Sequence, residues 1–153
     1  MQDILIRANS DGLYDFVIEG NEFASAGGFE TAIPVSLFTD ARAPAALVSE
    51  PQYRRGWIGN LLTAATMRQL GSILWVLDQS RITQERLNIA RLAAQDAFQW
   101  MVDDGVALGV KIDVRRNSVT GIIVFIEITD TSNVVSPYQT LWRATNASVI
   151  PNT

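Results

Sequence analysis

The chain has 153 residues, of which 48 % are hydrophobic and 18 % charged, a length and composition typical of one globular domain with one core. Its 12 basic and 16 acidic residues give a formal charge of −4, which excludes the basic surface that nucleic-acid binding requires. The chain contains no His and no Cys, which excludes disulfides, thiolate zinc sites and catalytic triads built on histidine.

We therefore expect a single domain over residues 1–153, with a hairpin and an irregular segment in residues 1–35. No apolar run approaches the roughly 18 residues that span a bilayer, and the N-terminus lacks the features of a signal peptide, so synthesis in a cytoplasm is expected. Two β-prone runs, Asp3–Ile6 and Leu13–Ile18, flank Asn9-Ser10-Asp11-Gly12, which predicts a hairpin. Residues 20–30 are rich in Gly, Asn, Ala and Ser and are predicted to be irregular.

The next stretch predicts short helices separated by a long connection. Residues 32–38 suit either a short strand or the start of a helix. Residues 39–56 contain two prolines, which oppose a continuous helix. Apolar spacing then predicts a helix over residues 60–70 on the basis of Leu61, Leu62, Ala65 and Leu70, with Gly71 as its end and a second short helix over residues 73–77.

The strongest helix signal lies between Thr83 and Asp104. Thr83 is a suitable N-cap, Glu85 lies in the first turn, and Gly105 stands where a helix ends. The predicted apolar stripe consists of Leu87, Ala90, Ala94, Ala97, Phe98 and Met101. Trp100 lies beside this stripe, where it either widens the buried face or offers an aromatic ring to a neighbour.

After Gly105 the apolar period changes to two, which predicts antiparallel strands. The predicted inward-facing row of the first strand consists of residues 106, 108, 110, 112 and 114, and that of the second strand of residues 122, 124, 126 and 128. A third run, Tyr138–Arg143, follows Pro137 and is expected to be an edge strand. The sequence thus predicts an α+β fold, a small antiparallel sheet packed against two or three helices, one of them long.

The outward row of the second strand contains two apolar residues, Ile123 and Phe125, where polar residues are expected. Either the chain's own segments cover them or a partner protein does, since burying two such side chains is worth roughly 1.5–3 kcal/mol each.

Four short patterns, in this order and spacing, resemble a known family. They are Ser36-Leu37-Phe38-Thr39-Asp40-Ala41-Arg42-Ala43, Arg54-Arg55-Gly56-Trp57, Gly71-Ser72-Ile73-Leu74-Trp75, and the helix end Trp100-Met101-Val102-Asp103-Asp104-Gly105-Val106-Ala107. Over residues 33–143 the chain resembles the Mu-type baseplate proteins of contractile phage tails, which are related to the lysozyme-like wedge and sheath-initiator proteins.

This resemblance implies a non-enzymatic structural protein of the virion tail baseplate, assembled in the host bacterial cytoplasm and needing no cofactor. The implied partners are baseplate wedge subunits, the tail sheath protein and the tail tube or hub, with six copies in a ring, and neither nucleic acid nor membrane. The implied role is to join wedge subunits and to seed sheath assembly by accepting or exchanging a β-strand. Such β-augmentation takes affinity from main-chain hydrogen bonds and register from alternate side chains.

Candidate contact residues follow from the resemblance and from the sheet. Wedge relatives carry a Glu-Pro-Arg motif, and here Glu50-Pro51 is followed by Gln52-Tyr53 before Arg54-Arg55, so the arginine is displaced; the alternative is a solvated turn. Trp57 is either a core residue or a contact. The full candidate set is Glu50, Pro51, Arg54, Arg55, Trp57, Ile123, Phe125, Tyr138, Leu141 and Trp142.

Two other classes of function remain open. A lysozyme-like glycosidase acting on peptidoglycan would need two carboxylates; Glu50 with Asp40 or Asp130 is the candidate pair, but no spacing singles it out. A generic soluble adaptor is the second. Asp103-Asp104 lacks calcium-loop spacing, and Gly27-Gly28 lacks the setting of a phosphate loop.

Overall fold

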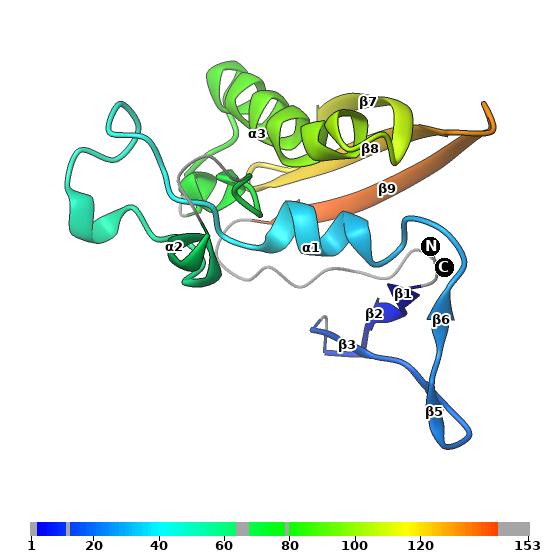
Figure 1. The fold of residues 1–153 in the computed structure, drawn as a ribbon. Helices are drawn as coiled ribbons and strands as arrows, with labels where there is room; N and C mark the ends of the chain where they lie inside the picture. The colour runs from blue at the N-terminus through cyan, green and yellow to red at the C-terminus, as the bar shows by residue number, and fades with distance from the viewer. Residues whose placement is uncertain (1–2, 12, 64–67, 79, 144–153) are drawn as a thin grey trace.

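The fold is α+β, as predicted (Figure 1). The computed structural model describes residues 3–11, 13–63, 68–78 and 80–143. Six short strands come first: β1 (Asp3–Ile4), β2 (Ile6–Ala8), β3 (Tyr14–Phe16), β4 (Ile18–Glu19), β5 (Glu22–Phe23) and β6 (Ser25–Ala26). Next come α1 (Ala32–Phe38), the 3-10 turns η1 (Pro51–Tyr53) and η2 (Leu74–Leu77) on either side of α2 (Gly59–Leu62), and then α3 (Gln84–Asp103). The chain continues into β7 (Ala107–Arg116), β8 (Gly121–Asp130) and β9 (Val135–Arg143).

The long helix α3 begins and ends where the sequence predicts. The Thr83 hydroxyl accepts a hydrogen bond from Arg86 N at 3.3 Å, which satisfies one of the free N–H groups of the first turn. Gly105 has φ +68°, a conformation that glycine adopts without steric cost and that ends many helices. The predicted stripe is buried except for Leu87, which is half-buried. Trp100 widens this face, and its Nε1 donates to Ser36 Oγ at 3.0 Å.

β7, β8 and β9 form one antiparallel sheet in that order, so β9 is an edge strand as Pro137 predicted. The inner row of β8, residues 122, 124, 126 and 128, is completely buried. The prediction for β7 is wrong at its start, because Ala107 is buried and Leu108 is exposed. The ladder shifts between Ala107 and Gly109, and this β-bulge inserts one extra residue that reverses the inward and outward faces.

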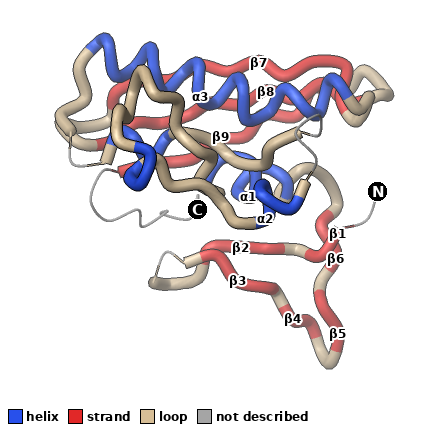
Figure 2. Tube along the Cα trace, turned by 60° about the vertical axis from the view of Figure 1, so that its left-hand side comes forward, coloured by secondary structure: helices blue, strands red, loops and turns tan. Residues whose placement is uncertain are grey.

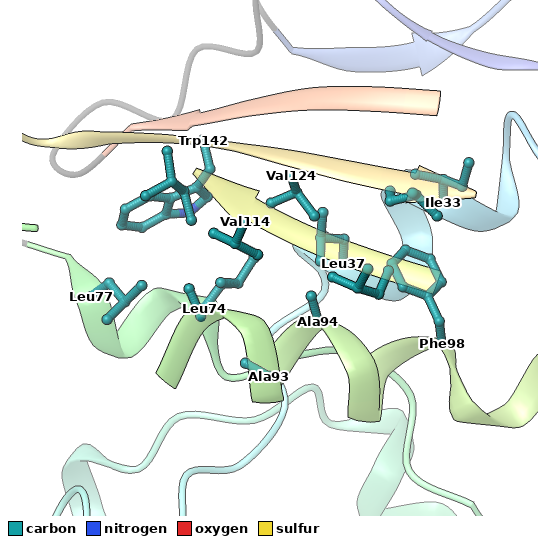
Figure 3. Packing of buried hydrophobic residues seen from close by; sticks show 14 of the residues in the cluster. Ile33, Leu37, Leu74, Leu77, Ala93, Ala94, Phe98, Val114, Val124 and Trp142 are labelled. Carbon is teal, nitrogen blue, oxygen red and sulfur yellow. The ribbon is translucent and has the colours of Figure 1, made fainter. Parts of the chain in front are cut away.

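One face of this sheet packs on α3 and α1, and the core lies between them. Figure 3 shows Ala94 and Phe98 of α3 and Leu37 of α1 meeting Val114 and Val124 of the sheet. The small alanines of α3 allow close approach of the helix to the strands. Residues 32–38, for which the sequence left strand and helix open, are therefore a helix that contributes Ile33 and Leu37 to the core.

Residues 3–26, which we call the N-terminal arm, form a bent hairpin that projects away from the main sheet (Figures 1 and 2). The predicted hairpin is confirmed where β2 pairs with β3, with turn residue Gly12 outside the described part. The start of its first run is paired elsewhere, since Asp3 and Ile4 pair with Ala26 and Ser25. Residues 20–30 are not wholly irregular, because β4 pairs with β5 and β1 with β6. Two-residue strands are too short to produce a readable alternation.

The helix predicted over residues 60–70 is wrong in its extent. α2 ends at Leu62, because Thr63 is extended with φ −86° and ψ 148°; residues 64–67, including Ala65 of the predicted stripe, lie outside the described part. Gly71 has φ +107°, and η2 follows as a 3-10 turn near the predicted short helix. No helix within the described residues is long and apolar enough to cross a bilayer.

Candidate protein-interaction site

The predicted connection over residues 39–56 is tied to the rest of the fold by backbone pairing. Ala41 N donates to Ser72 O, and Ser72 N donates to Thr39 O, both at 2.9 Å. Trp75 Nε1 donates to Ala41 O at 2.8 Å, and Trp57 N donates to Asp40 O at 2.8 Å. Gly71 permits this approach, since a Cβ there would lie 2.3 Å from Thr39 O. The connection is therefore held in one conformation.

The displaced arginine of the Glu50-Pro51 segment shapes this loop. Arg54 donates from Nε to Val48 O and from Nη2 to Ser49 O, each at 2.8 Å. Arg42 reaches the same loop from the other side, donating to Pro51 O at 3.0 Å. Glu50 is exposed and accepts from Gln52 Nε2 at 2.9 Å. The guanidinium groups thus satisfy loop carbonyls, and Glu50 with Pro51 stands at the exposed tip.

Arg55 has a different environment, because it lines a cavity of about 260 Å³. Its Nη1 lies 3.4 Å from both Asp40 Oδ2 and Asp78 Oδ2, and its guanidinium carbon lies 4.7 Å from the centre of the Trp75 ring. Burial raises the pKa of the Asp78 carboxyl, an effect that the Arg55 charge opposes. The arm contributes Leu13 and Tyr14 to this cavity, and burial also raises the pKa of Tyr14.

Trp57 belongs to an exposed apolar surface rather than to the core. It is 47 % exposed, and three side chains that follow it are more so: Ile58 at 71 %, Leu61 at 77 % and Leu62 at 84 %. We call these four residues the α2 patch. The sequence interpretation placed Leu61 and Leu62 on one helical face with Ala65 and Leu70; the adjacent leucines, which one helix face accommodates poorly, are the signal that it passed over.

The outer face of the sheet contains the two unexplained apolar residues, and both are half-buried. Ile123 is paired with Arg115 on one side and with Leu141 on the other. The Arg115 guanidinium carbon lies 4.9 Å from the centre of the Phe125 ring, and Arg115 Nε also donates to Asp113 at 2.8 Å. The chain's own side chains therefore cover this face in part, and an apolar strip remains accessible.

Two of the three candidates on β9 face the opposite way. Tyr138 and Trp142 lie in register with Ile126 and Ile122 of the buried row, and Trp142 is 4 % exposed. Trp142 therefore stabilises the core. Leu141 is the one of the three β9 candidates that lies on the outer face, beside Ile123.

The candidate catalytic and metal-binding residues do not form a site. Asp130 accepts hydrogen bonds from Ser132 N and Val134 N and so shapes the turn before β9. An exposed Glu50 lacks the apolar enclosure that a general acid needs. Asp104 binds Arg68, which lowers the pKa of Asp104. Within the described residues no group of three or more potential ligands is placed to hold a metal ion.

Comparison with known proteins identifies similar chains. Residues 29–135 match the model of a family described as phage protein GP46, a segment that runs from just before α1 to the first residue of β9. The Mu-like prophage FluMu protein gp46 of Haemophilus influenzae is 36 % identical over 104 residues, 68 % of each chain. Baseplate protein gp46 of Escherichia phage Mu is 27 % identical over 132 residues, 85 % of this chain and 89 % of that one.

Proposed function

We propose that this chain, which belongs to the phage protein GP46 family, joins baseplate wedge subunits and seeds sheath assembly by accepting a β-strand at its C-terminal sheet. The coarser role, that of a structural component of a phage tail baseplate, rests on the similarity of the chain to baseplate protein gp46 of phage Mu. We further propose that it is non-enzymatic and acts as one rigid domain, in several copies around the tail.

The strand-accepting role is supported by the edge of β7. Asn117 N donates to Gly121 O at 2.9 Å, and antiparallel pairs alternate between bonded and non-bonded. The residues of β7 that bond to β8 are therefore 111, 113 and 115, and the N–H groups of Val110, Ile112 and Val114 point away from β8. Among the described residues, no backbone hydrogen bond joins this outer edge to another segment, so it carries a row of available donors and acceptors.

A groove beside this edge suits the side chains of an added strand. The groove runs between α3 and β7 and is lined by Gln95, Asp96, Phe98, Gln99, Val102, Val110 and Ile112. The outer edge of β9 is less suitable, because Pro137 lies on it and has no N–H to donate. The availability of the β7 edge is the observation that carries the strand-accepting proposal.

The loop supplies the proposed wedge contact. Glu50 and Pro51 stand exposed at its tip, and Arg54 and Arg55 hold its shape through the bonds described above. Trp57 adds an exposed aromatic ring of the kind that protein interfaces favour. We propose that this side binds wedge subunits while the β7 edge binds sheath.

The test is proline at an outward-facing N–H of β7. Val110→Pro removes one donor from the outer edge without breaking the pairing to β8, so the protein should fold. Sheath growth on baseplates should fall by about tenfold or more, because a hydrogen bond worth about 1–3 kcal/mol is lost at a desolvated interface. Particles bearing sheath are counted by electron microscopy.

Val110→Ala is the matched control, because it removes the side chain and keeps the donor. Leu141→Pro makes the equivalent change on the outer edge of β9 and should permit sheath growth. Normal sheaths with Val110→Pro would contradict docking at β7, and loss of sheaths with Leu141→Pro alone would assign the docking to β9.

A further inference from the structure

The N-terminal arm has one buried face and one exposed apolar face. Leu5, Ala24 and Ala26 are buried, with Val17 packed against them. On the other face Phe16, Ile18 and Phe23 are 54 %, 64 % and 57 % exposed. The Phe16 and Phe23 rings meet edge to face at 5.5 Å, and Ile18 pairs with Phe23. We call these three residues the arm patch; an exposed apolar cluster of this kind typically marks an interaction surface.

The arm also carries the net charge of the chain. Residues 3–26 contain five acidic residues and one arginine, a formal charge of −4, so the acidic and basic residues outside the arm are equal in number. At the tip, Glu19 and Glu22 are directly opposite each other across the β4–β5 pair. Like charges in this position destabilise a hairpin, and a cation from a partner would relieve the repulsion. The arm therefore suits a surface that is apolar with arginine beside it.

The α2 patch is such a surface on the same molecule. The connection that leads into this patch contains Arg42 and Arg54. Both bond to loop carbonyls and have no carboxylate within ion-pairing distance among the described residues. A Cβ at Gly56, the residue before Trp57, would lie 3.2 Å from Arg42 Cβ, so the Arg42 backbone packs against the segment that leads into the α2 patch. Figures 1 and 2 show the β4–β5 tip of the arm well away from α2, so one copy does not satisfy its own surfaces.

We propose that the arm patch of one copy binds the α2 patch of a second copy, with Glu19 and Glu22 facing Arg42 and Arg54. Such a contact joins two different surfaces, so it is head-to-tail and each dimer retains one free surface of each kind for further copies. The arm precedes residues 29–135, which match the family model, whereas the α2 patch lies within them. The contact between copies is independent of strand addition at β7, but it uses Trp57 and Arg54, which the proposed wedge contact also uses, so one copy makes one of these two contacts at a time on that side.

The experiment is sedimentation analysis of the purified full-length chain across the micromolar range, with variants that remove one surface at a time. The wild type should associate in steps, and less so at high salt, which screens the charge pairing. Phe16→Ser with Phe23→Ser, and separately Ile58→Ser with Leu62→Ser, should each weaken self-association by about tenfold or more, as expected when central apolar contacts are lost.

Mixing the two double variants is the decisive step. Each retains the surface that the other lacks, so the mixture should form a one-to-one dimer that does not grow further. Leu92→Ser, which changes an apolar residue 61 % exposed on α3, is the matched control and should associate like the wild type. Circular dichroism confirms that each variant is folded.

Three results would overturn the proposal. They are a wild type that is monomeric at every concentration, a mixture that stays monomeric, and an α2-patch variant that still associates as strongly as the wild type, which would indicate arm-to-arm pairing. Exchanging Glu19 and Glu22 for lysine provides a further check, because association should weaken without loss of apolar area.

Discussion

β8 and the N-terminal arm carry the same two-residue alternation and place their apolar rows in opposite environments. The inner row of β8, residues 122, 124, 126 and 128, is 0 % exposed, because α3 lies across it with alanines that allow close approach. In the arm, Phe16 and Ile18 alternate in the same way and remain in solvent. Alternation therefore identifies the side chains that share a face, and the cover of that face depends on another part of the sequence.

The largest effect that tests this contrast is expected from a pair of phenylalanines. Phe98→Ala in α3 removes a fully buried ring and should lower the free energy of unfolding by about 3–5 kcal/mol. Phe23→Ala in the arm, where the ring is mostly exposed, should change it by less than about 0.5 kcal/mol. Urea denaturation followed by circular dichroism measures both. Similar losses for the two variants would mean that the arm patch contributes to the core.

A smaller effect is expected at Thr31, where the arm is fastened to α1. The Thr31 hydroxyl donates to Ile4 O at 2.7 Å and accepts from Ile6 N at 3.1 Å, and the residue is buried. Thr31→Ala leaves these groups without their partner and should cost about 1–3 kcal/mol, felt first in the arm. Hydrogen exchange should then quicken at Leu5 and Val17.

Amides of β8 are the internal reference for that measurement, since their hydrogen bonds lie within the sheet. If Thr31→Ala accelerates hydrogen exchange equally in β8 and in the arm, the two regions open together as one cooperative unit. The buried row of β8 and the exposed row of the arm would then differ in packing but not in local stability.

The sequence predicts most where the signal is local. Thr83 and Gly105 mark the ends of α3 because a cap hydroxyl and a left-handed glycine act on their own helix turns. The inner row of β8 is predicted because β-branched residues occupy every second position from 122 to 128. In both cases the residues that determine the element lie inside it.

Prediction fails where the outcome depends on distant residues. The bulge at Leu108 depends on register with Thr129 and Asp130, which β7 does not specify alone. Leu61 and Leu62 suggest a helix that continues to residue 70, but α2 ends at Leu62 and both side chains are exposed. Of the candidate contacts, Trp142 is buried while Trp57 is exposed, and residue type does not distinguish them. The arm patch was missed because its strands are two or three residues long.

The smallest effect is expected at Asp78, in the cavity where Leu13 and Tyr14 of the arm meet the connection. Burial raises the pKa of this carboxyl above its usual 3.8, so the folded protein holds the proton more tightly than the unfolded chain does. Stability from this group is therefore full below pH 3.8 and falls as the pH rises through the folded pKa. Asp104 and Asp113, whose pKa values are lowered by Arg68 and Arg115, act with the opposite sign.

Asp78→Asn isolates one of these effects, because the amide does not titrate. The difference in unfolding free energy between variant and wild type should shift in favour of the variant as the pH rises from 4 to 6, by less than about 1 kcal/mol because the group is partly solvated. Urea denaturation at a series of pH values gives this difference. A shift in favour of the wild type would mean that the attraction of Arg55 outweighs burial, and that the ion pair stabilises the junction between the arm and the connection.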